Sequence, residues 1–143
     1  MRFMMLIIPK GYETAAPGTA PDAKAVAAMM KFNESLQKAG VLLALDGLHP
    51  PSMGARVSFA GGKPKVTDGP FTEAKELVAG YWIWQVKSKE EAIEWLKRAP
   101  FAEGDEVELR QFFEADDFGE EFTPELREQE ERLRAQAAER QRQ

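Results

Sequence analysis

The side chains best suited to chemistry gather in one short stretch between two predicted strands. Four ionisable residues fall within nine positions there: Asp68, Glu73, Lys75 and Glu76. Carboxylates can carry protons, and loops held by rigid strands carry chemistry more often than cores do. The stretch therefore predicts an acid–base site with Asp68 and Glu73 as proton carriers. Lys75, Glu76 and Phe71 are the predicted ligand contacts.

His49 is the only histidine of the chain. It is therefore the only side chain that titrates near neutral pH without a shift in its pKa. It follows the second predicted strand, within a Gly-Leu-His-Pro-Pro turn. If this strand end meets the 68–76 loop, His49 is a third catalytic candidate, as a general base. A lone histidine in a turn is also commonly a solvated surface residue, and both interpretations stay open.

The carboxylates also have structural interpretations. Aspartate before Gly-Pro commonly accepts backbone N–H bonds in its own turn, which would make Asp68 a turn former. Glu73, Lys75 and Glu76 equally fit a solvated cluster or a mutual salt bridge. These acids, His49 and Asp46 have no recognised metal-ligand spacing, so no metal is expected. No phosphate-cradling glycine pattern appears, so no cofactor is expected either.

The composition fits a soluble globular protein. The chain has 143 residues, of which 43% are hydrophobic and 30% charged, enough for one domain with a core. No apolar run is long enough to span a bilayer, and residues 1–9 fit a first strand better than a signal peptide. The absence of cysteine excludes disulfides and thiolate chemistry. A cytoplasmic location without membrane attachment is expected, and the net charge of −5 argues against nucleic-acid binding.

Hydrophobic periodicity predicts the elements that must position these residues. Strands are expected at residues 2–8, 41–45, 55–60, 63–67, 77–86 and 107–113, and helices from about Pro21 to Gly40 and from Ser88 to Pro100. Gly61-Gly62 marks a tight hairpin between the third and fourth strands. The order of elements is that of a ferredoxin-like α+β fold with additional strands in the middle.

The strands also predict how the chain assembles. Two helices cover only one face of such a sheet, yet the strands at 2–8, 41–45 and 77–86 are apolar on both faces. A second copy of the sheet is the simplest cover, which favours a homodimer with facing sheets. The alternative is that the C-terminal segment folds back over the sheet. Most strand aromatics, Tyr81 among them, are expected in the core, with one or two lining a pocket for an apolar small molecule.

The composition changes after residue 113. A domain at 1–113 is therefore predicted, followed at 114–143 by an acidic linker and a polar C-terminal helix. Thr123-Pro124 is typical of a helix start, with threonine as the cap and proline at the first position. Leu126 and Leu133 form one narrow apolar stripe, which we expect to dock on a neighbouring surface.

Asp68-Gly69-Pro70-Phe71, followed by Glu73, Lys75-Glu76 and Gly80, resembles the signature of the YCII-related, DGPF-type family of small bacterial proteins. Gly47-Leu48-His49-Pro50 and the Gly61-Gly62 hairpin fit the same pattern. The resemblance covers residues 1–113 and implies a dimeric α+β barrel of the ferredoxin-like kind. Members are often encoded near sigma factors of the extracytoplasmic type, which implies a transcription-factor partner.

The resemblance leaves two functions open. The broader family is associated with enzymatic activity through a helix-borne histidine and an Asp-Pro acid. Here the first helix has no histidine, and Ala99-Pro100-Phe101 stands where Asp-Pro-aromatic is expected. One function is a small-molecule enzyme with acid–base chemistry in a pocket near the 68–76 loop. The other is a non-catalytic binding or regulatory protein that acts with a sigma-factor system.

Overall fold

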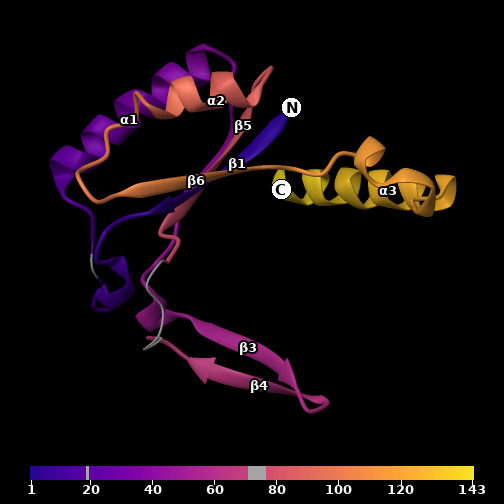
Figure 1. The fold of residues 1–143 in the computed structure, drawn as a ribbon, viewed down its shortest axis with the longest axis horizontal. Helices are drawn as coiled ribbons and strands as arrows, with labels where there is room; N and C mark the ends of the chain where they lie inside the picture. The colour runs from indigo at the N-terminus through magenta and orange to yellow at the C-terminus, as the bar shows by residue number, and fades with distance from the viewer. Residues whose placement is uncertain (19, 71–76) are drawn as a thin grey trace. The chain divides into compact units, whose positions relative to one another are not determined.

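The computed structural model describes residues 1–18, 20–70 and 77–143, and a four-stranded antiparallel sheet with two helices on one face forms its main body (Figure 1). The strand order in space is β2-β5-β1-β6. The elements are β1 (Arg2–Ile8), α1 (Ala23–Lys38), β2 (Leu42–Gly47), β5 (Gly80–Gln85), α2 (Lys89–Leu96) and β6 (Glu106–Gln111). The predicted α+β class is therefore confirmed.

The remaining two strands form a separate hairpin. β3 (Ala55–Ala60) and β4 (Lys63–Asp68) pair only with each other in the described part of the chain. Gly61 and Gly62 connect them with positive φ angles of 62° and 81°, which glycine adopts at little cost. The predicted hairpin is confirmed, and it lies outside the four-stranded sheet.

The core lies between the sheet and the helices. Side chains alternate along each strand, so every second residue of β1 and β5 points toward the helices. These residues pack with the apolar faces of α1 and α2 in one buried cluster: Phe3, Met5, Phe32, Leu36, Val41, Trp82, Trp84, Val86 and Ala92. The aromatic rings meet at an angle, with 5.6 Å between the ring centroids of Phe32 and Trp82, an arrangement that aromatic pairs prefer.

One polar side chain is buried with this cluster. Asn33, on the core face of α1, is 8% exposed. Its side-chain oxygen accepts a hydrogen bond of 2.9 Å from the indole N–H of Trp82 on β5. The bond satisfies a donor that would otherwise be buried without a partner, and it fixes the position of α1 along the sheet.

The helix ends follow their sequence signals. The N–H groups of Gly40 and Val41 donate to the carbonyls of Gln37 and Leu36 at 3.0 Å each, and Gly40 has a φ of 73°, which together form a Schellman cap. At the start of α2 the hydroxyl of Ser88 accepts a bond of 3.1 Å from the N–H of Glu91. The Glu91 carboxylate reaches back to the N–H of Lys87 at 2.7 Å, one residue earlier than in a regular capping box.

β2 contains an irregularity that the sequence does not predict. Leu42 pairs with Trp84, whereas Ala44 pairs with the adjacent Ile83, so Leu43 is left out of the ladder as a β-bulge. Leu43 is 49% exposed. Because of the bulge, β2 is not the simple two-sided apolar strand that its composition suggests.

Three strand boundaries differ from the predicted ones by two residues or more. β2 runs two residues beyond Leu45, β5 begins at Gly80 rather than at Leu77, and β6 ends at Gln111 rather than at Phe113. Periodicity places the apolar centre of a strand well, whereas its ends depend on which backbone groups find partners.

The C-terminal unit, Phe112–Gln143, is described here by itself. Contacts divide the chain into Met1–Gln111 and this unit. The acidic segment forms two short 3₁₀ turns, η3 (Ala115–Asp117) and η4 (Gly119–Glu121), before α3 (Pro124–Gln141). The predicted cap is present, since the Thr123 hydroxyl accepts a bond of 3.3 Å from the N–H of Leu126.

The apolar residues of α3 are solvent-exposed in this structure. Leu126 is 45% and Leu133 is 56% exposed, and docking of this stripe stays a prediction. Glu130 and Arg134, four residues apart, form an ion pair of 2.6 Å on the surface of the helix. No helix in the described ranges has the length and apolar character needed to cross a membrane.

Candidate functional site

The Asp68-Gly69 turn packs tightly against the residues that follow His49. The Gly69 N–H donates a hydrogen bond of 2.9 Å to the Gly54 carbonyl. A Cβ atom at Gly69 would lie 1.7 Å from the carbonyl oxygen of Pro51, in the 3₁₀ turn η2 (Pro51–Met53). Only glycine permits this approach. The end of β4 is thus held against the chain just beyond His49.

Two of the predicted catalytic side chains, His49 and Asp68, lie at the surface of the protein beside this packed turn. His49 lies between β2 and η2, and Asp68 is the last residue of β4, opposite Ala55. Both are exposed, whereas Pro50 beside His49 is buried. The other candidates, Glu73, Lys75, Glu76 and Phe71, lie outside the described residues. Their roles, and the pairing of His49 with an acid of this loop, stay predictions.

Several bonds fix the backbone around His49. The Leu48 N–H donates to the Ala79 carbonyl at 2.7 Å, just before β5. The Leu48 carbonyl accepts a short hydrogen bond from the hydroxyl of Tyr12, in the 3₁₀ turn η1 (Tyr12–Thr14). Burial raises the pKa of Tyr12, so its hydroxyl stays protonated as a donor at neutral pH. The segment that carries His49 is therefore tied both to the sheet and to the loop after β1.

A second pair of ionisable groups lies where β2 meets β5. Asp46 and Tyr81 are cross-strand partners, and the Tyr81 hydroxyl donates to the Asp46 carboxylate at 3.0 Å. This hydrogen bond and the charge of Asp46 raise the pKa of Tyr81. The pair belongs to the sheet face opposite the helices, because Asp46 and Tyr81 alternate with the core positions. Asp46 lies three residues before His49 in the sequence.

Sequence reasoning missed this pair and placed Tyr81 with the core aromatics. In a regular ladder running on from the Leu42–Trp84 pair, Leu45 would face Tyr81. The bulge at Leu43 shifts the register by one residue and puts Asp46 there instead. The only signal in the sequence was an aspartate at the end of an apolar strand.

The described residues also form a groove elsewhere, on the helical side of the fold. It has a volume of about 500 Å³ and lies between α1 and the residues after α2, with Phe32, Ser35, Arg98 and Pro100 among its lining residues. Neither His49 nor Asp68 lines it. Across the described ranges, no group of three or more His, Asp or Glu side chains could hold a metal ion.

Two comparisons with known proteins were informative. No curated protein matches the chain. The family model of the YCII-related domain matches residues 1–116, which include the whole sheet, both of its helices, the hairpin and the Asp68-Gly69 turn. Since this match spans most of the 143 residues, the chain belongs to the YCII-related family.

Proposed function

We propose that this YCII-related protein is a homodimer that binds a small molecule near the end of β2 and acts on it by acid–base chemistry. His49 and Asp68 are the proposed proton carriers, with Glu73 of the following loop. The observation that carries the proposal is the packing of Gly69 on Pro51, where a Cβ atom would lie 1.7 Å from the carbonyl oxygen. A turn this constrained holds the end of β4, with Asp68, against the residues that follow His49.

The proposed dimer rests on the sheet face opposite the helices. Met4 and Leu6 of β1 and Tyr81 and Ile83 of β5 pair across the strands on this face and alternate with the buried core residues. Figure 1 shows both α1 and α2 on the other face. A two-fold axis would bring this face against its own copy, which is the usual symmetry of a dimer.

The strand order supports the same assembly. An antiparallel β2-β5-β1-β6 sheet with both crossover helices on one face has the arrangement of a ferredoxin-like unit. Two such units with facing sheets would form a dimeric α+β barrel. The Asp46–Tyr81 pair would then lie inside the assembly, where water is excluded and its hydrogen bond is stronger.

The dimer is tested by placing a charge in the apolar face. We expect the wild-type protein to sediment at about twice its chain mass of 16.0 kDa. Ile83→Lys should sediment as a monomer, because an unpaired ammonium buried between two sheets costs several kcal/mol. The control is Val26→Lys, which adds the same charge at an exposed position of α1 and should leave the dimer intact. A monomeric wild-type protein would exclude this assembly.

The ligand site is tested by a thermal-shift screen of metabolites. A true ligand at about 100 times its Kd should stabilise the wild-type protein by about 2.7 kcal/mol. His49→Ala and Asp68→Asn should fold normally, since both side chains are exposed, but should lose most of the ligand-induced shift. A ligand that stabilises the wild type and both variants equally does not bind through these groups.

A regulatory function is the second candidate, and the exposure of His49 and Asp68 is the observation that favours it. Solvated side chains suit recognition by another protein as well as chemistry. In this alternative the protein contacts a transcription factor, and the same screen finds no ligand that depends on His49. In both proposals the protein acts in the cytoplasm.

A further inference from the structure

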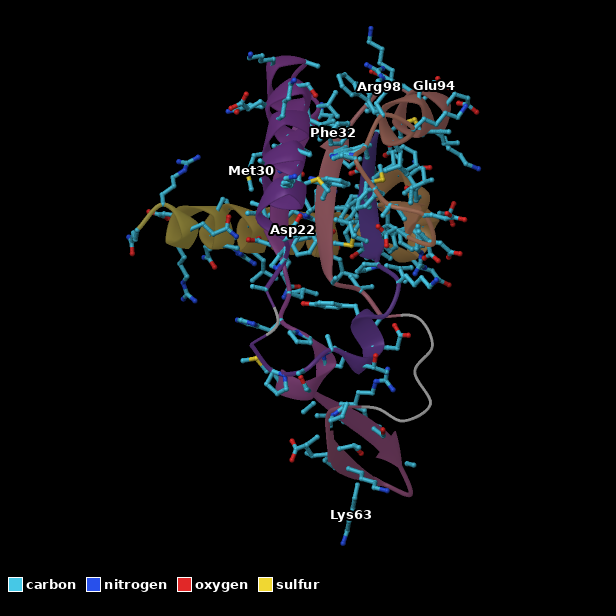
Figure 2. The ribbon with its side chains drawn as sticks, turned by 90° about the vertical axis from the view of Figure 1, so that its left-hand side faces the viewer. Asp22, Met30, Phe32, Lys63, Glu94 and Arg98 are labelled. Atoms are coloured by element: carbon cyan, nitrogen blue, oxygen red, sulfur yellow. The ribbon has the colours of Figure 1, made fainter. Side chains whose placement is uncertain are left out.

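The groove on the helical side of the fold is lined by both apolar and basic residues. Phe32 reaches the groove from α1 and Pro100 from the segment after α2, and the Phe32 side chain is only 8% exposed. In Figure 2, Phe32 lies on α1 and Arg98 lies at the end of α2. The volume of about 500 Å³ is within the range of sites that bind small organic molecules.

The charge of the groove is opposite to that of the protein. Three cationic residues line it, Lys31, Lys38 and Arg98, against one acid, Glu34. The whole chain has a net charge of −5. In the part of the chain that the structure describes, none of the three cations forms an ion pair with Glu34. Their charge is therefore available to a ligand.

Arg98 is ordered before any ligand arrives. Its guanidinium lies over the Trp95 ring at 4.2 Å from the ring centroid, and its Nε–H donates to the Glu94 carbonyl at 3.4 Å. These contacts restrict the side chain and leave the terminal N–H groups of the guanidinium for other partners. A pre-ordered guanidinium loses less entropy when it binds a carboxylate or phosphate.

We propose that this groove binds a small amphipathic organic anion. The apolar, aromatic part of the ligand contacts Phe32 and Pro100, and its acidic group lies among Lys31, Lys38 and Arg98. The site is separate from the one proposed at the end of β2, and each can fail without the other.

These cations also have a structural use. Lys38 ends α1, and Arg98 follows α2 closely, where positive charge stabilises the carbonyl end of a helix. Stabilisation of the helix ends explains the positions of Lys38 and Arg98, although it does not itself imply a ligand. It does not account for Lys31, which lies two turns before the end of α1.

Anilinonaphthalene sulfonate, an aromatic anion, is the probe for this site. We expect saturable binding at low ionic strength, with shifts of the backbone amide signals of Lys31 and Ser35 on α1. The uncharged parent anilinonaphthalene should bind about tenfold more weakly or worse. Lys31→Glu should weaken binding of the anion by a similar factor and leave the melting temperature nearly unchanged.

The matched control is Lys24→Glu, because Lys24 lies on the same helix and does not line the groove. Long-range electrostatics would make both charge reversals equally harmful, and that result would overturn the proposal. It is also overturned if the probe shifts the amides of Met4 and Leu6 on the sheet and leaves those of Lys31 and Ser35 unchanged.

Discussion

Gly69→Ala should lower the free energy of unfolding by about 2–4 kcal/mol. The added methyl would lie 1.7 Å from the Pro51 oxygen and 2.7 Å from its carbonyl carbon. Both are backbone atoms, so no side-chain rotation relieves the overlap. The turn must open, and opening it also breaks the hydrogen bond of 2.9 Å from the Gly69 N–H to the Gly54 carbonyl.

Gly54→Ala is the matched control for this substitution. Gly54 belongs to the same packed turn, but among the described residues a methyl there would meet only the Pro51 oxygen, at 3.6 Å, an ordinary contact. Its φ of −114° is open to alanine. We expect a change within about 0.5 kcal/mol. Denaturant unfolding of both variants measures the difference, and equal stabilities would mean that Gly69 is not confined as described.

Asn33→Leu should cost about 1–3 kcal/mol. The change removes the acceptor of the Trp82 indole N–H, whose bond to Asn33 measures 2.9 Å. Trp82 is 2% exposed, so water does not readily replace the lost partner. The penalty therefore reflects a buried donor left without an acceptor, in addition to any misfit of the leucine side chain.

A double-mutant cycle separates these two contributions. With Trp82→Phe the donor is absent, so Asn33→Leu should cost at least about 0.5 kcal/mol less in that background. The parallel cycle with Trp84→Phe is the control, because in the described part of the chain the Trp84 indole N–H has no hydrogen-bond partner to lose. Costs that are additive in the Trp82 cycle would mean that the hydrogen bond contributes nothing to stability.

Local signals in the sequence predicted most of the fold. Periodicity located the helices and the apolar strand centres, Gly61-Gly62 located the hairpin, and Thr123 and Ser88 located two helix starts. These signals work because each depends on neighbours within a few residues. The family was also predicted from the residues around Asp68, and the YCII-related match confirms it.

What the sequence could not provide depends on contacts between distant residues. Asn33 looks like an ordinary polar residue of a helix until Trp82 is placed beside it. The closeness of Gly69 to Pro51 appears only when the ends of the hairpin are folded back on η2. The partnership of Asp46 with Tyr81 needs the exact register of β2, which the composition of an apolar strand does not determine.

The bulge in β2 has a consequence beyond register. β2 is an edge of the four-stranded sheet, and a flat apolar edge strand offers its free N–H and C=O groups to any other unpaired strand. Leu43 interrupts that row at its start, and the charge of Asp46 lies near its end. A bulge and a charged side chain each make an edge strand a poor template for the addition of another strand. This edge of the sheet thereby discourages open-ended polymerisation through backbone hydrogen bonds.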